Sequence, residues 1–251
     1  MSNNIILGRY YSTNSFIHSM NSTAKIICIF LFSVITIIMQ DFILGILLLG
    51  FNAFIVVKTN IPWQLYLKSI SKMKFFLIFL FVIDMIFGIE IFTNILMIIK
   101  TILLINYSTV LTLTTPPTEI TYGLEKFLTP LNKLKIPVNK ISLTISLALR
   151  FIPTIFDEAT MILKSQASRG VDYYNSNLKG KLEAIRGLII PMINLSIKRA
   201  DMLGDAMEVR LFSFERRRSN YRMNEWKLSD SIIVFCHLAV FIIILMKVVF
   251  L

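Results

Sequence analysis

Five long apolar runs divide this chain, and they constrain its fold more than any other feature. A helix needs about 20 predominantly apolar residues to cross the hydrocarbon core of a bilayer. Runs that approach or reach this length are residues 24–40, 42–57, 75–89, 91–113 and 229–251. The mean hydropathy of +0.71 and a charged content of only 16% are too apolar for a soluble domain of this size. We therefore predict an all-α integral membrane protein with about five transmembrane helices.

Positive charge is unevenly distributed over the segments that join these runs. Arg9 precedes the first run, Lys25 lies at its beginning, and four lysines lie between the second and the third. The turns on the opposite side carry Asp41 and Glu90 instead. Because Lys and Arg are retained on the cytoplasmic side of a membrane, we expect the N-terminus and the long segment before the last run to lie in the cytoplasm. The expected location is the cell (plasma or inner) membrane, as a multi-pass protein.

The formal net charge of +11 does not by itself indicate a nucleic-acid partner. The basic residues are not clustered beside aromatic side chains that could stack on bases, whereas anionic lipids at the inner membrane surface attract such a charge. We therefore expect the lipid bilayer, and no nucleic acid, as the partner of this charge.

Neither a metal site nor a nucleotide site is expected within this chain. Cys28 and Cys236 lie inside apolar runs, and His18 and His237 are isolated, so the spacing of a metal site is missing. The sequence also has no Gly-x-x-x-x-Gly-Lys-Ser/Thr run, the loop that cradles phosphates in many ATPases. We predict no cofactor in this chain, so any energy source must be a partner.

Asp84 and Lys100 are ionisable residues that lie in the interior of predicted spans. Charge inside a membrane is by default a hypothesis of a functional site, because it is costly to bury. The plainer interpretation is that the two residues pair with each other or reach an interface, although they lie at different depths of the proposed hairpin.

The segment 115–228 predicts a cytoplasmic or interfacial module of three helices. Pro116 and Pro117 followed by Glu119 form a helix start, and this helix is expected to end near residue 128. Apolar residues at helical spacing predict two longer helices, at 138–168 and from 178 to about 210.

The two longer helices look like a matched pair. Each contains one proline, Pro153 or Pro191, which should kink it, and we expect the pair to cross. The chain then divides into an N-terminal membrane module (1–114, an entry segment plus four spans), a cytoplasmic coupling module (115–228) and a final transmembrane helix (229–251).

An arginine ends each of these longer helices. The first closes with Gln166-Ala167-Ser168-Arg169-Gly170 and the second with Ala206-Met207-Glu208-Val209-Arg210. A guanidinium can chelate a carboxylate or several carbonyls of a partner protein, and at a helix C-terminus it faces the negative end of the dipole. The plain alternative is a solvated arginine, since most exposed ion pairs contribute little. Two arginines in equivalent positions favour a pair of docking tips.

Motifs along nearly the whole chain carry a resemblance to a known family. They are Gly8-Arg9-Tyr10, Ser15-Phe16-Ile17-His18, Thr23-Ala24-Lys25-Ile26, Thr114-Thr115-Pro116-Pro117-Thr118-Glu119, Leu124-Glu125-Lys126, Pro130-Leu131, Arg150-Phe151-Ile152-Pro153, Glu158, the Gln166–Gly170 run, Pro191, Ser196, Arg199-Ala200-Asp201 and the Ala206–Arg210 run. Together they resemble the transmembrane T component of energy-coupling factor transporters, the family that includes the cobalt-transport Q permeases.

The resemblance implies a scaffold within a four-part importer rather than an enzyme. Two cytoplasmic ABC ATPases would bind ATP and magnesium, a small membrane S component would capture a vitamin or a metal ion, and this chain would join them. The residues that the resemblance assigns to ATPase coupling are Ser168, Arg169, Gly170, Val209, Arg210 and Leu211. Those that it assigns to support of the coupling helices are Arg150, Pro153, Glu158, Gln166, Pro191, Arg199 and Glu208.

The second tip departs from the family pattern, which has Ala-Arg-Gly at both tips. The first reads Ser168-Arg169-Gly170, a mild change, but Leu211 replaces the glycine of the second. Because leucine resists the left-handed conformation of a helix cap, we expect the third helix to run on through Phe212 or to end differently. Leu211 could instead contact the partner.

A membrane enzyme acting on diphosphate lipids is the rival from another class. Asp201 and Asp205 share one helical face, and Asp157 and Glu158 add two more acids that could hold magnesium. These acids are interleaved with basic residues, as on a solvated amphipathic face. Co-purification discriminates between the two, because only the transporter component would bring ATPases with it.

A permease that carries its substrate unaided is the second alternative. Its pathway would need polar residues that face each other within the spans. The first two spans offer little beyond Ser33, Thr36 and Asn52, which favours a scaffold over a conduit.

Overall fold

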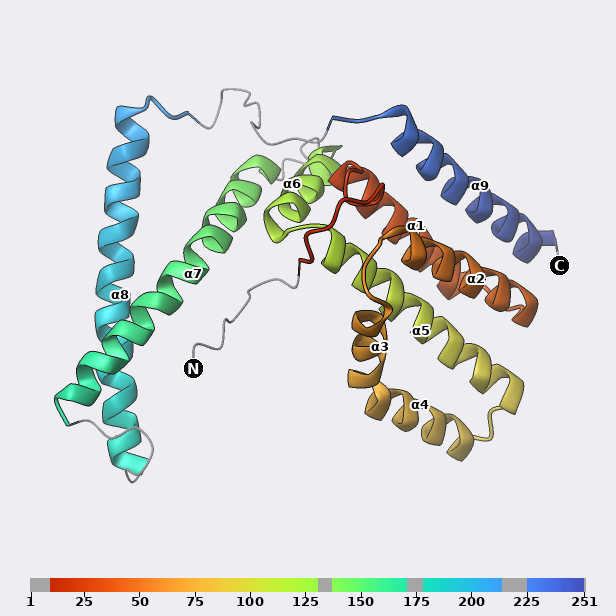
Figure 1. The fold of residues 1–251 in the computed structure, drawn as a ribbon, viewed down its shortest axis with the longest axis horizontal. Coiled ribbons are helices and arrows are strands. Elements are labelled where there is room, and N and C mark those ends of the chain that lie inside the picture. The colour runs from red at the N-terminus through yellow and green to blue at the C-terminus, as the bar shows by residue number, and fades with distance from the viewer. Residues whose placement is uncertain (1–9, 131–136, 171–177, 214–224, 251) are drawn as a thin grey trace. The chain divides into compact units, whose positions relative to one another are not determined.

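The computed structural model describes residues 10–130, 137–170, 178–213 and 225–250, and every regular element in these ranges is a helix. The helices are α1 (Ser22–Ile38), α2 (Phe42–Lys58), α3 (Trp63–Lys72), α4 (Lys74–Ile86), α5 (Ile91–Thr114), α6 (Pro117–Leu128), α7 (Val138–Ser168), α8 (Leu178–Val209) and α9 (Leu228–Phe250). The chain forms two compact units, Met1–Val138 with Asn220–Leu251, and Asn139–Ser219. Figure 1 shows α7 and α8 as the two long helices of the second unit.

The predicted all-α membrane fold is confirmed, with one difference in the third apolar run. α5 and residues Leu228–Lys247 of α9 are long and apolar enough to cross a membrane, while α1 and α2 are apolar helices of 17 residues each. α4 has only 13 residues, which at 1.5 Å per residue is roughly 20 Å and short of a bilayer core. The run at 75–89 is therefore not one straight spanning helix.

The amphipathic helix α3 precedes α4 and was not predicted. It starts after Pro62 and ends at Met73, whose backbone (φ −93°, ψ 3°) breaks the path between α3 and α4. Tyr66 is the buried residue of α3, and its hydroxyl lies 2.9 Å from the Oγ1 atom of Thr59. Long apolar runs do not indicate this helix, because about half of its residues are polar.

The core of the first unit is built around α1. Phe32 and Ile35 of α1, and Met39 directly after it, pack with buried residues of α2, α5 and α9. The ring of Phe32 stacks on that of Tyr107 in α5, with centroids 4.2 Å apart. Burial of these large side chains contributes about 1.5–3 kcal/mol each, so the packing of α1 against α5 and α9 is a main source of stability in this unit.

The buried ammonium of Lys25 joins three parts of the first unit. Its Nζ atom donates to the carbonyls of His18 and Thr114, both at 3.3 Å, and to Thr115 Oγ1 at 3.2 Å. The amide of Tyr11 also donates to the Leu113 carbonyl at 2.9 Å. The residues before α1 are thereby fixed to the C-terminal end of α5, whose carbonyls attract a cation.

Helix α6, which was predicted as part of the coupling module, lies against α1 within the first unit. A Cβ atom at Gly123 would lie 2.7 Å from Ile26 Cδ1 and 2.9 Å from the backbone carbon of Ser22. Only a residue without a side chain permits so close an approach of two helices. The domain boundaries at 115 and 228 stay predictions.

Asp84 and Lys100, the charged residues in the interior of the apolar helices, do not pair with each other. Lys100 donates to the Ile37 carbonyl at 3.2 Å, whereas Asp84 is buried and its Oδ2 atom has no hydrogen-bond partner among the described residues. The suggested pairing of these two side chains is therefore not formed. Lys247 of α9 instead forms an ion pair of 2.5 Å with Asp41, the residue before α2.

Candidate functional site

The two predicted tips are both helix C-termini in the structure. α7 ends at Ser168 and α8 at Val209, so Arg169 and Arg210 each directly follow the last helical residue. The next residue has a positive φ in both cases, 87° at Gly170 and 52° at Leu211. Each arginine is therefore the cap residue that precedes a left-handed turn.

Hydrogen bonds of the backbone show that both turns close in the same way. At the first tip the Gly170 amide donates to the Ala167 carbonyl at 3.0 Å, and at the second the Leu211 amide donates to the Glu208 carbonyl at 2.8 Å. The Phe212 amide adds a bond of 3.0 Å to the Met207 carbonyl. These two bonds at the second tip are the pair that defines a Schellman motif.

The expectation that Leu211 would prevent this cap is wrong. α8 does not continue through Phe212, because Leu211 itself takes the left-handed conformation. A non-glycine residue there costs roughly 1–2 kcal/mol, and the two hydrogen bonds, which satisfy otherwise unpaired carbonyls, offset that cost.

Both arginines are exposed. Within the described part of the chain neither forms an ion pair or a side-chain hydrogen bond, which leaves each guanidinium fork available to a partner. The flanks differ: Ser168 and Gly170 are small, whereas the side chains of Val209 and Leu211 are apolar, with exposed fractions of 85% and 80%. The two tips thus have the same kind of backbone turn, but the side chains beside the arginines differ.

Glu158 and Arg199 join α7 to α8. An Arg199 Nη2 atom forms an ion pair with the Glu158 carboxylate, and the guanidinium carbon lies 5.6 Å from the centre of the Phe151 ring. The two charged side chains are mostly buried, with exposed fractions of 23% and 24%, so water screens this pair less than an exposed one. The contact fixes the crossing of the two long helices.

A second contact between α7 and α8 involves Gln166, four residues before the first turn. A Cβ atom at Gly187 would lie 3.6 Å from the side-chain carbon Cδ of Gln166, so the amide of α7 packs closely over the glycine of α8. Gly187 and Phe151 could not be predicted as contact residues, because both lie far along the chain from their partners.

The remaining supporting residues make no such contacts. Pro153 and Pro191 lie inside α7 and α8 as predicted. Arg150 and Glu208 are exposed, and their side chains form no hydrogen bond or ion pair with the described residues. Glu208 takes part in the second turn only through its backbone carbonyl, which accepts a hydrogen bond from the Leu211 amide.

The acids that suggested a magnesium site are not gathered together. Glu158 is engaged by Arg199, while Asp157, Asp201 and Asp205 are exposed. No group of three or more potential metal ligands occurs among the residues that the structure describes.

Known transport proteins are similar to this chain over most of its length. A family model described as a cobalt transport protein matches residues 13–221, which include both tips. The chain is 34% identical over 247 residues to the energy-coupling factor transporter transmembrane protein of Lactococcus lactis, with 92% of this chain and 93% of that protein covered. The protein of the same description from Streptococcus equi is 33% identical over 246 residues (92% and 91% covered), and that from Bacillus subtilis 33% over 250 residues (93% and 94%).

Proposed function

Because the chain belongs to the cobalt transport protein family and is a transmembrane component of an energy-coupling factor transporter, we propose that it couples two cytoplasmic ABC ATPases to a membrane S component. In this proposal the S component captures a vitamin or a metal ion. This chain is the non-catalytic scaffold that passes ATP-driven motion to it. ATP and magnesium are bound by the ATPases, and this chain needs no cofactor of its own.

The observation that carries the proposal is the pair of left-handed turns that follow Arg169 and Arg210, each closed by the same backbone hydrogen bond. Two ATPases of one transporter present two grooves, and a scaffold needs two matched contacts to hold both. The arginines are exposed, are unpaired within the described residues and directly precede a left-handed turn. An arginine anchor in a desolvated groove can contribute several kcal/mol, whereas the same residue in solvent contributes little.

The ion pair between Glu158 and Arg199 connects α7 to α8, so that motion of one helix is transmitted to the other. A motion that one ATPase imposes on the tip of α7 reaches α8 only where the helices are joined. The joint at Glu158, Arg199 and Phe151 makes the two long helices move together, and thus passes the motion of both ATPases to the membrane unit and the S component. The orientation with cytoplasmic tips follows from the distribution of lysines.

An affinity pull-down of the tagged full-length protein in mild detergent tests the proposal. Mass spectrometry of the eluate should identify two nucleotide-binding ATPases and a small hydrophobic protein, which would also point to the substrate. If the protein is folded and no ATPase accompanies it, the coupling function is wrong. The exposed acids of α7 and α8 should then be tested for metal-dependent chemistry on diphosphate lipids.

A further inference from the structure

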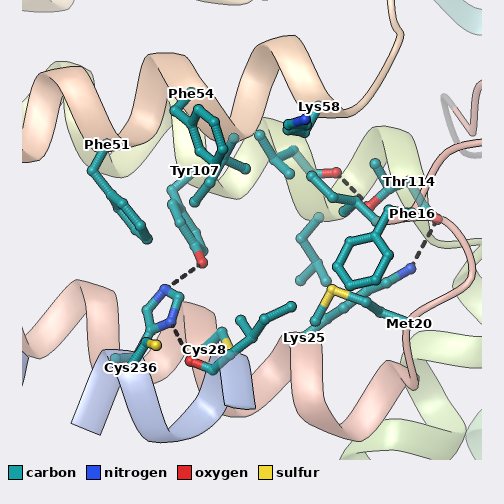
Figure 2. Close-up of a pocket in the computed structure, with 16 residues that line it drawn as sticks. Phe16, Met20, Lys25, Cys28, Phe51, Phe54, Lys58, Tyr107, Thr114 and Cys236 are labelled. Atoms are coloured by element: carbon teal, nitrogen blue, oxygen red, sulfur yellow. Dashed lines mark hydrogen bonds between the residues drawn. The ribbon is translucent and has the colours of Figure 1, made fainter. Parts of the chain in front are cut away.

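A cavity of about 250 Å³ lies within the first unit, among the N-terminal segment, α1, α2, α5 and α9. Figure 2 shows Phe51, Tyr107 and Cys236 at one end and Lys58, Thr114 and Lys25 at the other. From Phe51 to Lys58 the cavity follows about two turns of α2, which corresponds to roughly 10 Å. This length suits part of an extended hydrocarbon chain that runs parallel to the helices.

At the end of the cavity near Phe51, the side chains of Tyr107 and His237 already have hydrogen-bond partners. The Tyr107 hydroxyl donates to His237 Nε2 at 2.9 Å, and His237 Nδ1 donates to the Ile233 carbonyl at 2.9 Å. The other labelled residues at that end are Phe51 and Cys236 (Figure 2). Apart from the weakly hydrogen-bonding thiol of Cys236, the described polar groups there already have partners, so an apolar group fits this end better than a polar one.

The opposite end carries an available positive charge. The Lys25 ammonium is occupied by three oxygen atoms. The exposed Lys58 has only the face of the Phe54 ring beside it, with Nζ 5.5 Å from the ring centre. Lys58 forms no hydrogen bond or ion pair with the described residues, and no Asp or Glu is among the residues that line the cavity. A negative group is the complement of this end.

We propose that the cavity binds an anionic phospholipid, with one acyl chain between α2 and α9 and its phosphate at Lys58. An apolar chain and a negative phosphate match the two ends in chemistry and in order. The lysines that follow α2, at positions 68, 72 and 74, assign this end to the cytoplasmic surface, where anionic lipids concentrate. The site does not involve the two arginine tips. A lipid bound there contacts α1, α2, α5 and α9, so the packing of these helices depends on the lipid composition of the membrane.

Photo-crosslinking in nanodiscs tests the proposal. The full-length protein, purified with whatever partners accompany it, is placed in phosphatidylcholine nanodiscs that contain a small share of phosphatidylglycerol with a diazirine near the end of one acyl chain. Mass spectrometry should locate the label on peptides with Phe51, Tyr107 or His237. The variant Lys58→Ala should reduce this labelling about five-fold, as expected for loss of one lysine contact to an anionic lipid.

Two comparisons make this result decisive. Lys72→Ala removes an exposed lysine of α3 that does not line the cavity, and it should leave the labelling unchanged. A phosphatidylcholine with the same diazirine should label the cavity peptides much less. Equal labelling by the two lipids, equal effects of the two variants, or absence of label from these peptides would each overturn the proposal.

The exposed thiol of Cys236 gives an independent measurement, because it lines the cavity while Cys28 is buried. Phosphatidylglycerol should slow the reaction of Cys236 with a maleimide, and Lys58→Ala should remove this protection. Glycerol phosphate alone should not protect. Protection by glycerol phosphate would show a phosphate site without an acyl chain, and would overturn the proposal.

Discussion

Arg169 and Arg210 occupy the same position in two caps of the same geometry, although the residues that follow them differ. Gly170 and Leu211 both have positive φ, 87° and 52°, and the amide of each donates to the carbonyl three residues earlier. The position of each arginine is therefore set by the backbone turn, and the side chains around it are free to suit two different partner surfaces.

Replacement of either arginine by alanine should weaken the recovery of ATPases and the uptake of substrate while membrane insertion stays intact. Loss of a buried interfacial arginine costs about 2–5 kcal/mol, and the double variant should be much worse than either single one, because each tip engages a separate ATPase. Pull-down yield and uptake in membrane vesicles measure both effects.

The control for the arginine variants is Arg186→Ala, which removes an exposed arginine from α8 outside the tips. It should leave assembly and uptake unchanged. Normal uptake and complex recovery in both single variants, or the same defect in the control, would contradict the assignment of Arg169 and Arg210 as anchors.

The variant Leu211→Gly should be tolerated and should raise the stability of the second tip. Glycine adopts the left-handed conformation without strain, so the change should recover roughly 1 kcal/mol of the cost that leucine bears. The matched change Gly170→Leu places the same cost on the first tip and should lower stability. Thermal unfolding of the purified complex measures both; loss of ATPases with Leu211→Gly would instead reveal a contact made by the leucine side chain.

The ion pair between Glu158 and Arg199 should matter more for transport than for assembly. Glu158→Gln or Arg199→Gln loosens the joint between α7 and α8 while both tips remain, so ATPase recovery should persist and uptake per hydrolysed ATP should fall. The exchange Glu158→Arg with Arg199→Glu should restore part of the coupling. Loss of ATPase binding in the single variants, without rescue by the exchange, would show that the pair acts only in folding.

The sequence predicted the features that depend on local pattern and missed those that depend on distant contacts. Long apolar runs and helix-ending residues placed α5, α7 and α9 within a few residues of their observed ends. The 10-residue helix α3 was missed because its alternation of polar and apolar residues is too short to stand out. The partners of Arg199 lie on another helix, and no spacing along the chain can reveal them.

The error at Leu211 has a different physical cause. Intrinsic preference argues against a left-handed leucine by roughly 1–2 kcal/mol, and the prediction followed that preference. Two backbone hydrogen bonds at the end of α8, each worth about 1 kcal/mol, are enough to reverse it. A local preference of this size decides the conformation only where tertiary and capping interactions are weaker.

Acidification should loosen the N-terminal segment through His18. Burial, the largest effect, lowers the pKa of His18 below 6.5, and the charge of Lys25 adds to this, while the hydrogen bond to the Tyr11 carbonyl opposes it. Below about pH 6.5 the folded protein therefore binds fewer protons than the unfolded chain. The free energy of unfolding has its full value above pH 6.5 and falls as the pH drops toward the lowered pKa. Thermal unfolding between pH 8 and pH 5 measures the trend, which His18→Asn should flatten.

The variant Gly123→Ala should detach α6 from α1. The added Cβ atom would lie 2.7 Å from Ile26 Cδ1 and 2.9 Å from the backbone of Ser22, and since backbone cannot yield as a side chain can, overpacking should cost about 1–3 kcal/mol. Gly204→Ala in α8 is the matched control. Apart from the backbone of α8 itself, no atom of the described residues lies within 4 Å of its new Cβ, and helix propensity should raise stability by up to about 1 kcal/mol. Limited proteolysis after α6 and thermal unfolding measure the difference. Equal behaviour of the two variants would mean that the close packing of α6 on α1 does not hold this part of the unit together.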